Sequence, residues 1–252
     1  MSGHSKWHNI KLKKGKVDAQ RGALFTKLSK EIILATKGGS ADPEANYRLK
    51  MAVEKARENN MPQDNIKRAI ARASGADGAK EIEEIRYEGY GPAGVAVVVD
   101  AATDNRNRTA SELRFLFSRH GGTLGETGSV AWMFDPRGIV EVENAALGED
   151  ELTEAALVDG VVDVRYDDGS LEGRSIVSTE PGALASVRDA LVAKRLHVTS
   201  MVLGVEPKGA VSPSGDDLRS VVAFLDALEE HEDVQRVFSN AELDVAQLEA
   251  LA

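Results

Sequence analysis

Residues 18–39, DAQRGALFTKLSKEIILATKGG, predict a long amphipathic helix that decides the class of the first part of the chain. Leu24, Leu28 and Ile32 recur at every fourth position, so they share one helical face, which Phe25 and Ile33 widen. The segment begins with Asp, a favoured N-cap residue, and ends with a Gly pair that favours termination. A stripe of this kind has to be buried against other elements, and we therefore expect a helical domain.

Two further segments predict shorter helices. Asp42-Pro43-Glu44 combines an N-cap with Pro in the first turn, and Leu49 and Val53 follow on one helical face. Met61-Pro62 then restarts a third helix. Short amphipathic helices bury their stripes only against one another, so residues 1–80 are predicted to hold a three-helix bundle after a basic arm.

The arm itself predicts nucleic-acid binding. From Met1 to Val17 it has no acidic residue and five lysines. Lysines neutralise phosphates, and the Trp7 ring offers a base a surface for stacking. A basic tail that only keeps the protein soluble is the alternative, but an indole gains little in such a tail. The predicted contacts in this region are His4, Ser5, Lys6, Trp7, Asn9, Lys11, Lys13, Lys14, Lys16, Arg21 and Lys27.

The formal net charge of −10 hides a division between two parts of the chain. Residues 1–80 carry 17 Lys and Arg against 8 Asp and Glu, a net of +9. The remainder carries 14 against 33, a net of −19. A basic module on an acidic body indicates that the first part faces a polyanion.

After a linker at 76–84 the pattern changes to short strands and helices. Val95–Val99 predicts a strand, and the preceding Gly89–Gly94 matches G-x-G-x-x-G. A dinucleotide-binding loop has to follow a strand and open a helix, whereas these glycines precede the strand and include Pro92. The segment is therefore interpreted as a turn, and no cofactor is predicted.

TDNRNRT at 103–109 leads into a helix that Asp104 caps, or that Thr109 and Glu112 cap one turn later. Two hypotheses stand equally for its arginines. Arg106 and Arg108 contact phosphate near a helix N-terminus, or they pair with acids of the acidic body.

The later segments predict two α/β domains. A strand is expected at Ser129–Phe134, with Trp132 in the core, and residues 138–205 read as β-α-β-β-α-β, the ferredoxin-like pattern. The last helix, Asp217–Glu230, and a strand at Val234–Phe238 have no neighbouring partners. Joining them to residues 85–134 completes another sandwich. The predicted fold is α+β and multi-domain, with domains at 1–80, at 81–135 plus 206–252, and an inserted ferredoxin-like domain at 136–205.

Catalytic motifs are missing from the sequence. The five His residues are scattered without H-E-x-x-H, and there is no phosphate-binding loop, no G-x-S-x-G and no Cys. We expect no enzyme activity, no metal site and no cofactor. The absence of Cys, of a long apolar run and of a secretory signal favours a cytoplasmic protein without membrane contact.

Several blocks of sequence together resemble one family. They are GHSKW at 3–7, NIK at 9–11, FTKL at 25–28, DPEAN at 42–46, NMP at 60–62, DNI at 64–66, YEGYGP at 87–92, TDNRNRT at 103–109 and GSVAWMF at 128–134. In this order they resemble the YebC family, with small departures at Tyr47 and Ala93. The resemblance implies an N-terminal helical domain followed by two α/β domains, the third inserted within the second.

The function that the resemblance implies has two forms. Bacterial members are labelled probable transcriptional regulators that bind DNA. A mitochondrial relative resembles a translational activator of cytochrome c oxidase, and other members look like translation factors that help ribosomes through proline-rich stretches. We expect a monomeric translation factor that binds ribosome or RNA. The alternatives are a regulator that binds promoter DNA and an interaction protein that acts through the acidic body.

Overall fold

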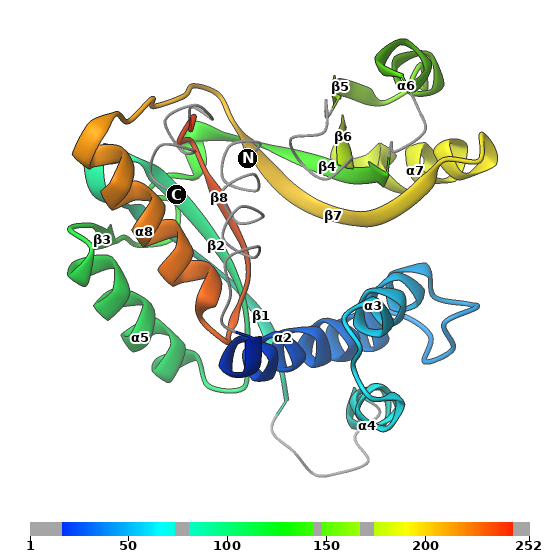
Figure 1. Cartoon of the computed structure of the whole chain (residues 1–252), viewed down its shortest axis with the longest axis horizontal. Coiled ribbons are helices and arrows are strands. Elements are labelled where there is room, and N and C mark those ends of the chain that lie inside the picture. Colours follow the sequence, from blue (N-terminus) through cyan, green and yellow to red (C-terminus); the bar gives the residue numbers. More distant parts are fainter. Residues whose placement is uncertain (1–16, 74–80, 144–147, 167–173, 244–252) are drawn as a thin grey trace. The chain divides into compact units, whose positions relative to one another are not determined.

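A computed structural model describes residues 17–73, 81–143, 148–166 and 174–243, with side chains from residue 21 onward (Figure 1). These residues fall into two compact units. One comprises 17–131 together with 213–241, and the other comprises 132–212. The first unit contains the helical bundle and one α/β domain, and the second contains the other α/β domain.

The helical bundle consists of α2 (Val17–Lys37), α3 (Tyr47–Glu58) and α4 (Gln63–Ala73). Two residues of the predicted stripe, Leu28 and Ile32 of α2, are buried in the core of the bundle with residues of α3 and α4, whereas Leu24 is 36% exposed. Burying such a side chain contributes roughly 1.5–3 kcal/mol each. Ile82 and Ala102 belong to the same cluster, so the core of the bundle continues into the neighbouring α/β domain.

The start of α3 differs from the prediction. Asn46 caps this helix instead of Asp42, and its side-chain oxygen accepts a hydrogen bond from the Leu49 N–H at 3.1 Å. The Asn46 amide also donates to the Ala35 and Ser40 carbonyls, both at 2.8 Å. These bonds tie the cap to the end of α2, and they fix where α3 begins. Asp42 instead closes a local turn by accepting from the Glu44 N–H.

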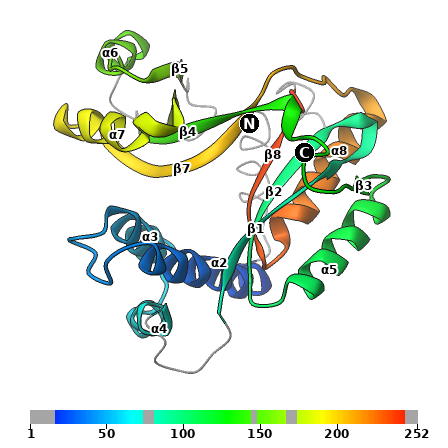
Figure 2. The same ribbon diagram turned by 180° about the vertical axis from the view of Figure 1, so that it is seen from behind.

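The first α/β domain has a four-stranded sheet in the order β3-β1-β2-β8. Its strands are β1 (Glu83–Tyr90), β2 (Ala96–Thr103), β3 (Thr123–Leu124) and β8 (Val234–Ser239). Helices α5 (Arg106–Arg119) and α8 (Gly215–Glu230) lie side by side on one face, as Figures 1 and 2 show. Phe117 of α5 and Phe224 of α8 meet edge to face at 4.8 Å beneath them.

The final strand completes this first sheet. β8 pairs antiparallel with β2, placing Val97 opposite Ser239 and Val99 opposite Val237. Residues from 96–103 and 234–239 therefore contribute to one core, as predicted, although more than a hundred residues separate them.

The glycine-rich segment is a turn only in its second half. Pro92–Gly94 forms a 3-10 turn between antiparallel β1 and β2. Gly89 and Tyr90, however, belong to β1, whereas the sequence predicted that they form part of the turn. Gly89 leaves room for its neighbours, because a Cβ there would lie 2.5 Å from the Thr123 carbonyl oxygen and 2.6 Å from the Phe117 ring. In a strand such a glycine permits close packing of the backbone.

The inserted domain has the predicted β-α-β-β-α-β order. Its sheet runs β5-β6-β4-β7, and all of its pairings are antiparallel. The elements are β4 (Phe134–Glu143), α6 (Glu149–Ala155), β5 (Val161–Arg165), β6 (Arg174–Thr179), α7 (Leu184–Ala193) and β7 (His197–Pro207). The segment 167–173 between β5 and β6 lies outside the described residues.

The predicted strand at Ser129–Phe134 is wrong. Ala131–Met133 is a 3-10 turn, Trp132 is 66% exposed instead of buried, and the strand begins only at Phe134. The cause lies in β1, where the buried Glu88 carboxylate accepts the N–H groups of Gly128, Val130 and Ala131, each at 2.9 Å. These bonds bend the backbone and remove its donors from strand pairing.

Candidate nucleic-acid interface

The predicted contacts divide between described and undescribed parts of the chain. Nine of them lie outside the described residues, namely His4, Ser5, Lys6, Trp7, Asn9, Lys11, Lys13, Lys14 and Lys16. Arg21, Lys27, Arg106 and Arg108 are described, and the structure gives them different surroundings. Arg21 is exposed on α2, with its guanidinium 5.6 Å from the centre of the Phe25 ring.

Lys27 of α2 forms a hydrogen bond with the C-terminal end of α8. Its ammonium donates to the Glu229 carbonyl, and the neighbouring Lys30 donates to the Glu232 carbonyl at 3.0 Å. Carbonyls at a helix C-terminus lack helical partners and carry partial negative charge, so they attract cations. Burial lowers the pKa of Lys27 to about 8, although the Glu229 carboxylate opposes the change. Lys27 thus has a structural partner inside the protein.

Asp233, in the turn before β8, is the centre of a buried polar network. Its carboxylate accepts hydrogen bonds from Lys30, from Arg108 at 3.0 and 3.2 Å, and from the Thr109 hydroxyl at 2.6 Å. Its side chain is fully buried. Burial alone would raise the pKa of Asp233, but the bonds from Lys30, Thr109 and Arg108 outweigh it and lower the pKa to about 2.

This network joins the helical bundle to the α/β domain. Lys30 comes from α2, Arg108 and Thr109 come from α5, and Asp233 precedes β8. Beside it, Glu31 of α2 contacts Arg236 at 3.2 Å and Lys55 at 3.7 Å. Sequence reasoning missed these contacts because the partners lie up to 205 positions apart.

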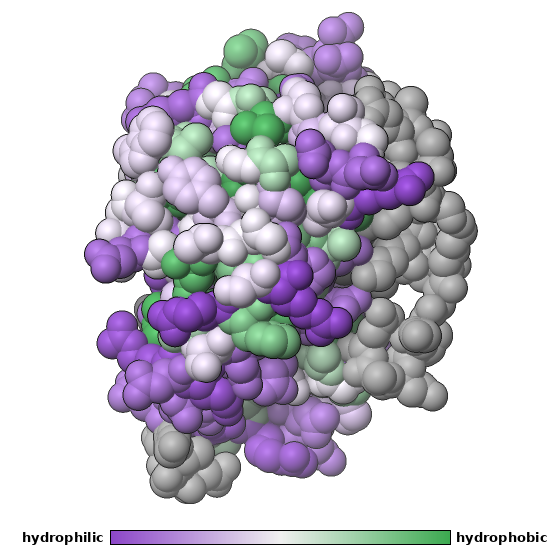
Figure 3. Space-filling view, turned by 90° about the vertical axis from the view of Figure 1, so that its left-hand side faces the viewer, coloured by the Kyte–Doolittle hydropathy of each residue, from purple (hydrophilic) through white to green (hydrophobic). Residues whose placement is uncertain are grey.

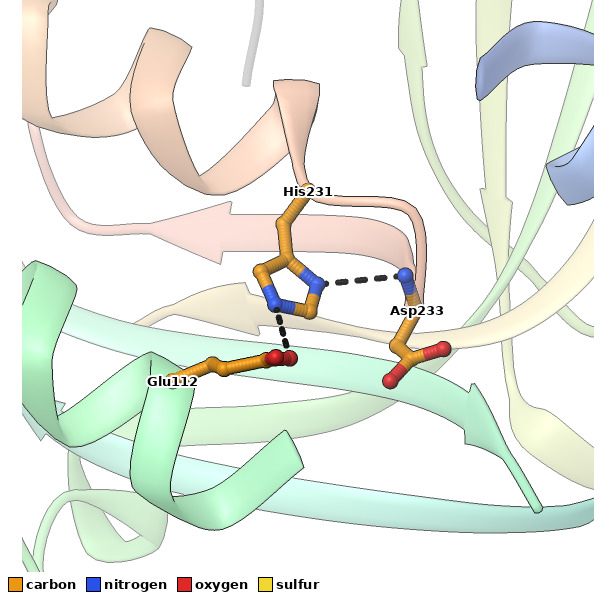
Figure 4. A group of neighbouring side chains, drawn as sticks. All are labelled: Glu112, His231 and Asp233. Atoms are coloured by element: carbon orange, nitrogen blue, oxygen red, sulfur yellow. Dashed lines mark hydrogen bonds and ion pairs between the residues drawn. The ribbon is translucent and has the colours of Figure 1, made fainter. Parts of the chain in front are cut away.

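Glu112, His231 and Asp233 form a cluster beside the network (Figure 4). One ligand atom from each lies within 4.8 Å of the others, a spacing that suits a metal ion. The His231 Nδ1, however, accepts the Asp233 N–H at 3.1 Å, so its Nε2 carries the proton toward Glu112, also 3.1 Å away. The Asp233 carboxylate already contacts two cations, which would repel a metal. The cluster therefore favours a hydrogen-bond network.

The two arginines of the TDNRNRT segment differ in their contacts. Asn105 caps α5 by accepting the Arg108 N–H at 3.2 Å, so neither predicted cap is right. Arg108 faces Asp233, Asp104 and Glu112, as the acid-pairing hypothesis expects. Arg106 is 66% exposed, and its nearest described acid is Glu83 at 3.7 Å. Arg106 is therefore the more exposed of these two arginines.

The helical bundle exposes further cations. Four have acidic neighbours, in the pairs Lys37–Glu81, Arg48–Glu84, Lys50–Glu44 and Lys55–Glu31. Arg57 at the end of α3 and Lys67 and Arg68 on α4 are exposed, and they make no ion pair with any described residue. Exposed cations that are not held in an ion pair remain available to contact a polyanion.

Among the described residues, none of the helices combines the length and the apolar character that crossing a bilayer requires.

The fold and this surface together define a class of protein, in which a basic helical bundle precedes two α/β domains, one inserted in the other. The chain belongs to the TACO1/YebC family. The model of the "TACO1/YebC protein N-terminal domain" matches residues 5–76, and that of the "TACO1/YebC second and third domain" matches residues 82–241.

Individual relatives agree over nearly the whole length. A protein of Desulforamulus reducens is 48% identical over 244 residues, covering 96% of this chain and 99% of its own. A protein of Rubrobacter xylanophilus is 49% identical and covers 96% of each chain. Both are named "Probable transcriptional regulatory protein". The crystal structure of a conserved hypothetical protein from Aquifex aeolicus is similar with a TM-score of 0.81 at 42% identity, covering 91% of this chain and 93% of that one.

Proposed function

We propose that this protein is a non-enzymatic regulator of gene expression that binds nucleic acid. In its finer form, the proposal is a cytoplasmic translation factor that contacts ribosome or RNA through the arm and the helical bundle, and that assists difficult stretches such as proline-rich ones. The main observation behind the proposal is the uneven distribution of charge, with a net of +9 over residues 1–80 and of −19 over the rest of the chain. The exposed Arg57, Lys67 and Arg68, which make no ion pair with any described residue, support it.

The arm is the part to test first. Co-sedimentation with ribosomes from cell lysate, at low and moderate salt, compares wild type with a Lys11/Lys13/Lys14/Lys16→Glu variant. Wild type should enter the ribosomal fractions, and the variant should not, because reversed charges repel the phosphate backbone. Wild type that never enters these fractions would overturn the translation-factor form.

A matched pair of variants tests whether binding depends on the position of the positive charges or only on the net charge of the protein. Lys13→Glu/Lys14→Glu and Lys194→Glu/Arg195→Glu change the net charge equally, but the second pair is exposed after α7 of the inserted domain. The arm pair should weaken co-sedimentation strongly, whereas the α7 pair should leave it near wild type. Equal losses would show that only net charge matters and would remove the arm from the proposal.

A DNA-binding regulator is the second candidate, and the relatives' printed name, "Probable transcriptional regulatory protein", is compatible with it. Specific DNA binding requires a promoter duplex to bind about 10³-fold or more tighter than a random duplex at the same salt. Competition between the two duplexes in a mobility-shift titration measures this ratio. Equal affinities would exclude this candidate and leave the RNA form standing.

A further inference from the structure

The outward face of α5 contrasts with the acidic body that carries it. Phe115 is 62% exposed there, although a solvent-facing position of an amphipathic helix usually holds a polar residue. Arg114 and Arg119 are exposed beside it, and neither makes an ion pair with a described residue. Residues 81–252 carry 33 Asp and Glu residues. Even so, none of the acids among the described residues pairs with Arg114 or Arg119.

Helical geometry places these three residues together. Arg119 lies four positions after Phe115, so the two side chains are neighbours on the helix surface. Arg114 precedes Phe115 and points about 100° away from it around the helix axis, so it flanks the ring at a greater distance, on the side opposite to Arg119. Thr109, Leu113 and Phe117 hold the opposite face in the core, which fixes the orientation of the helix.

The neighbouring surface is predominantly polar. Figure 3 shows the side of the molecule that carries α5 and α8, where small hydrophobic patches are separated by strongly hydrophilic residues. The one acid of α5, Glu112, is already engaged, because His231 and Arg108 contact it. An aromatic ring between two arginines is therefore a local exception on this face.

From this arrangement we propose a second contact surface, formed by Arg114, Phe115 and Arg119, that binds single-stranded RNA. The ring of Phe115 stacks on one unpaired base, and the two guanidinium groups contact the phosphates on either side. An acidic protein would pair with the arginines, but it would not need a flat exposed ring. The inference rests on the proposed function and adds a contact on the part of the chain that carries net negative charge.

Fluorescence anisotropy with a labelled oligouridine of about 20 nucleotides tests this surface in the full-length protein. Phe115→Ala should weaken binding by about fivefold to a hundredfold, the range for stacking one base on an aromatic side chain. Phe115→Trp should restore it. Arg114→Gln/Arg119→Gln should weaken binding and reduce the slope of log affinity against log salt by about 0.7 for each phosphate that the protein no longer neutralises.

Three controls make the result specific. Leu203→Ala removes an equally exposed apolar side chain, at 61%, from the inserted domain and should leave affinity unchanged. A blunt RNA duplex of the same length should bind Phe115→Ala as it binds wild type, since paired bases cannot stack on the ring. Thermal unfolding should give the same Tm for every variant, because all the altered side chains are exposed.

The outcomes separate this inference from the proposed function. If the arm variant loses oligouridine while the Phe115 and arginine variants bind like wild type, the α5 surface is overturned and the proposed function stands. Variants that keep their affinity for RNA but lose an acidic protein from a pull-down would also overturn it. If wild type neither binds oligouridine nor co-sediments with ribosomes, both are overturned.

Discussion

Two buried carboxylates, Asp233 and Glu88, are stabilised in different ways. Asp233 accepts hydrogen bonds from side chains of two other elements, two of them cationic, at sequence separations of 203 and 125. Glu88 accepts three backbone N–H groups from one loop, 40 to 43 positions away. Against the effect of burial, these hydrogen bonds lower the pKa of both carboxyl groups. Only the Asp233 carboxylate, however, depends on the identity of distant side chains. The comparison indicates that Asp233 links two domains, whereas Glu88 shapes one loop.

The largest expected effect comes from removing the Asp233 carboxylate. Asp233→Ala should lower the free energy of unfolding by about 3–5 kcal/mol, because it leaves Lys30 and Arg108 without their shared anion in a buried site. Denaturant titration measures the change. Glu84→Ala is the control, since it removes the exposed partner of Arg48 and should lower stability by less than about 1 kcal/mol. Equal effects of the two substitutions would contradict the linking role of Asp233.

A smaller and more local effect is expected at Glu88. Glu88→Gln should lower stability by about 1–3 kcal/mol, because an amide replaces one acceptor oxygen by a donor that faces backbone donors. Hydrogen exchange should accelerate at the Gly128, Val130 and Ala131 amides. In Asp233→Ala these three amides should exchange more slowly than in Glu88→Gln. Faster exchange spread evenly over the first unit in Glu88→Gln would remove the distinction between the two carboxylates.

The pH dependence sharpens the comparison further. The pKa of Asp233 is lowered from 3.8 to about 2 in the folded state, so its ionised form stabilises the fold above pH 3.8. This stabilisation amounts to about 2 kcal/mol, and it is lost as the pH falls through the window between those two values. The difference in unfolding free energy between wild type and Asp233→Asn should shrink across that window. A difference that stays constant between pH 5 and pH 2 would count against the assigned bonds.

Lys27 should affect stability in the same pH direction as Asp233, but in the alkaline range. Its pKa is lowered from 10.5 to about 8 on folding, so the unfolded chain binds more protons between those values. Wild-type stability should therefore gain a contribution as the pH rises through that window. Thermal unfolding at pH 7 and 9.5 should show this gain relative to Lys27→Met, and Lys50→Met should behave as wild type. The same pH response in Lys27→Met would place the titration elsewhere.

The sequence predicts those parts of the fold that local patterns determine. The spacing of Leu28 and Ile32 predicted α2. The unpaired helix and strand near the C-terminus predicted a core shared with residues 85–134, and β8 does pair with β2. The prediction failed where distant hydrogen bonds decided local structure. Asn46 caps α3 because it also binds the end of α2, and Trp132 is exposed because Glu88 bends the preceding loop.

The candidate interface was predictable only as a charge pattern. The arm remains a prediction, because residues 1–16 lie outside the described part of the chain. Spacing alone left Arg106 and Arg108 equivalent, and only the fold placed Arg108 against Asp233 while leaving Arg106 more exposed. The same holds for Phe115, whose sequence position does not show which helical face is covered.

The pairing of β8 with β2 also has a consequence for the order in which a nascent chain can fold. The strands of the inserted domain, from Phe134 to Pro207, are continuous in sequence and can assemble during synthesis. The first sheet has to wait for residues 234–239, and Lys30 and Arg108 wait for Asp233. During translation, the N-terminal helices therefore precede their final partner by some two hundred residues, and the later domain is finished before the earlier one closes.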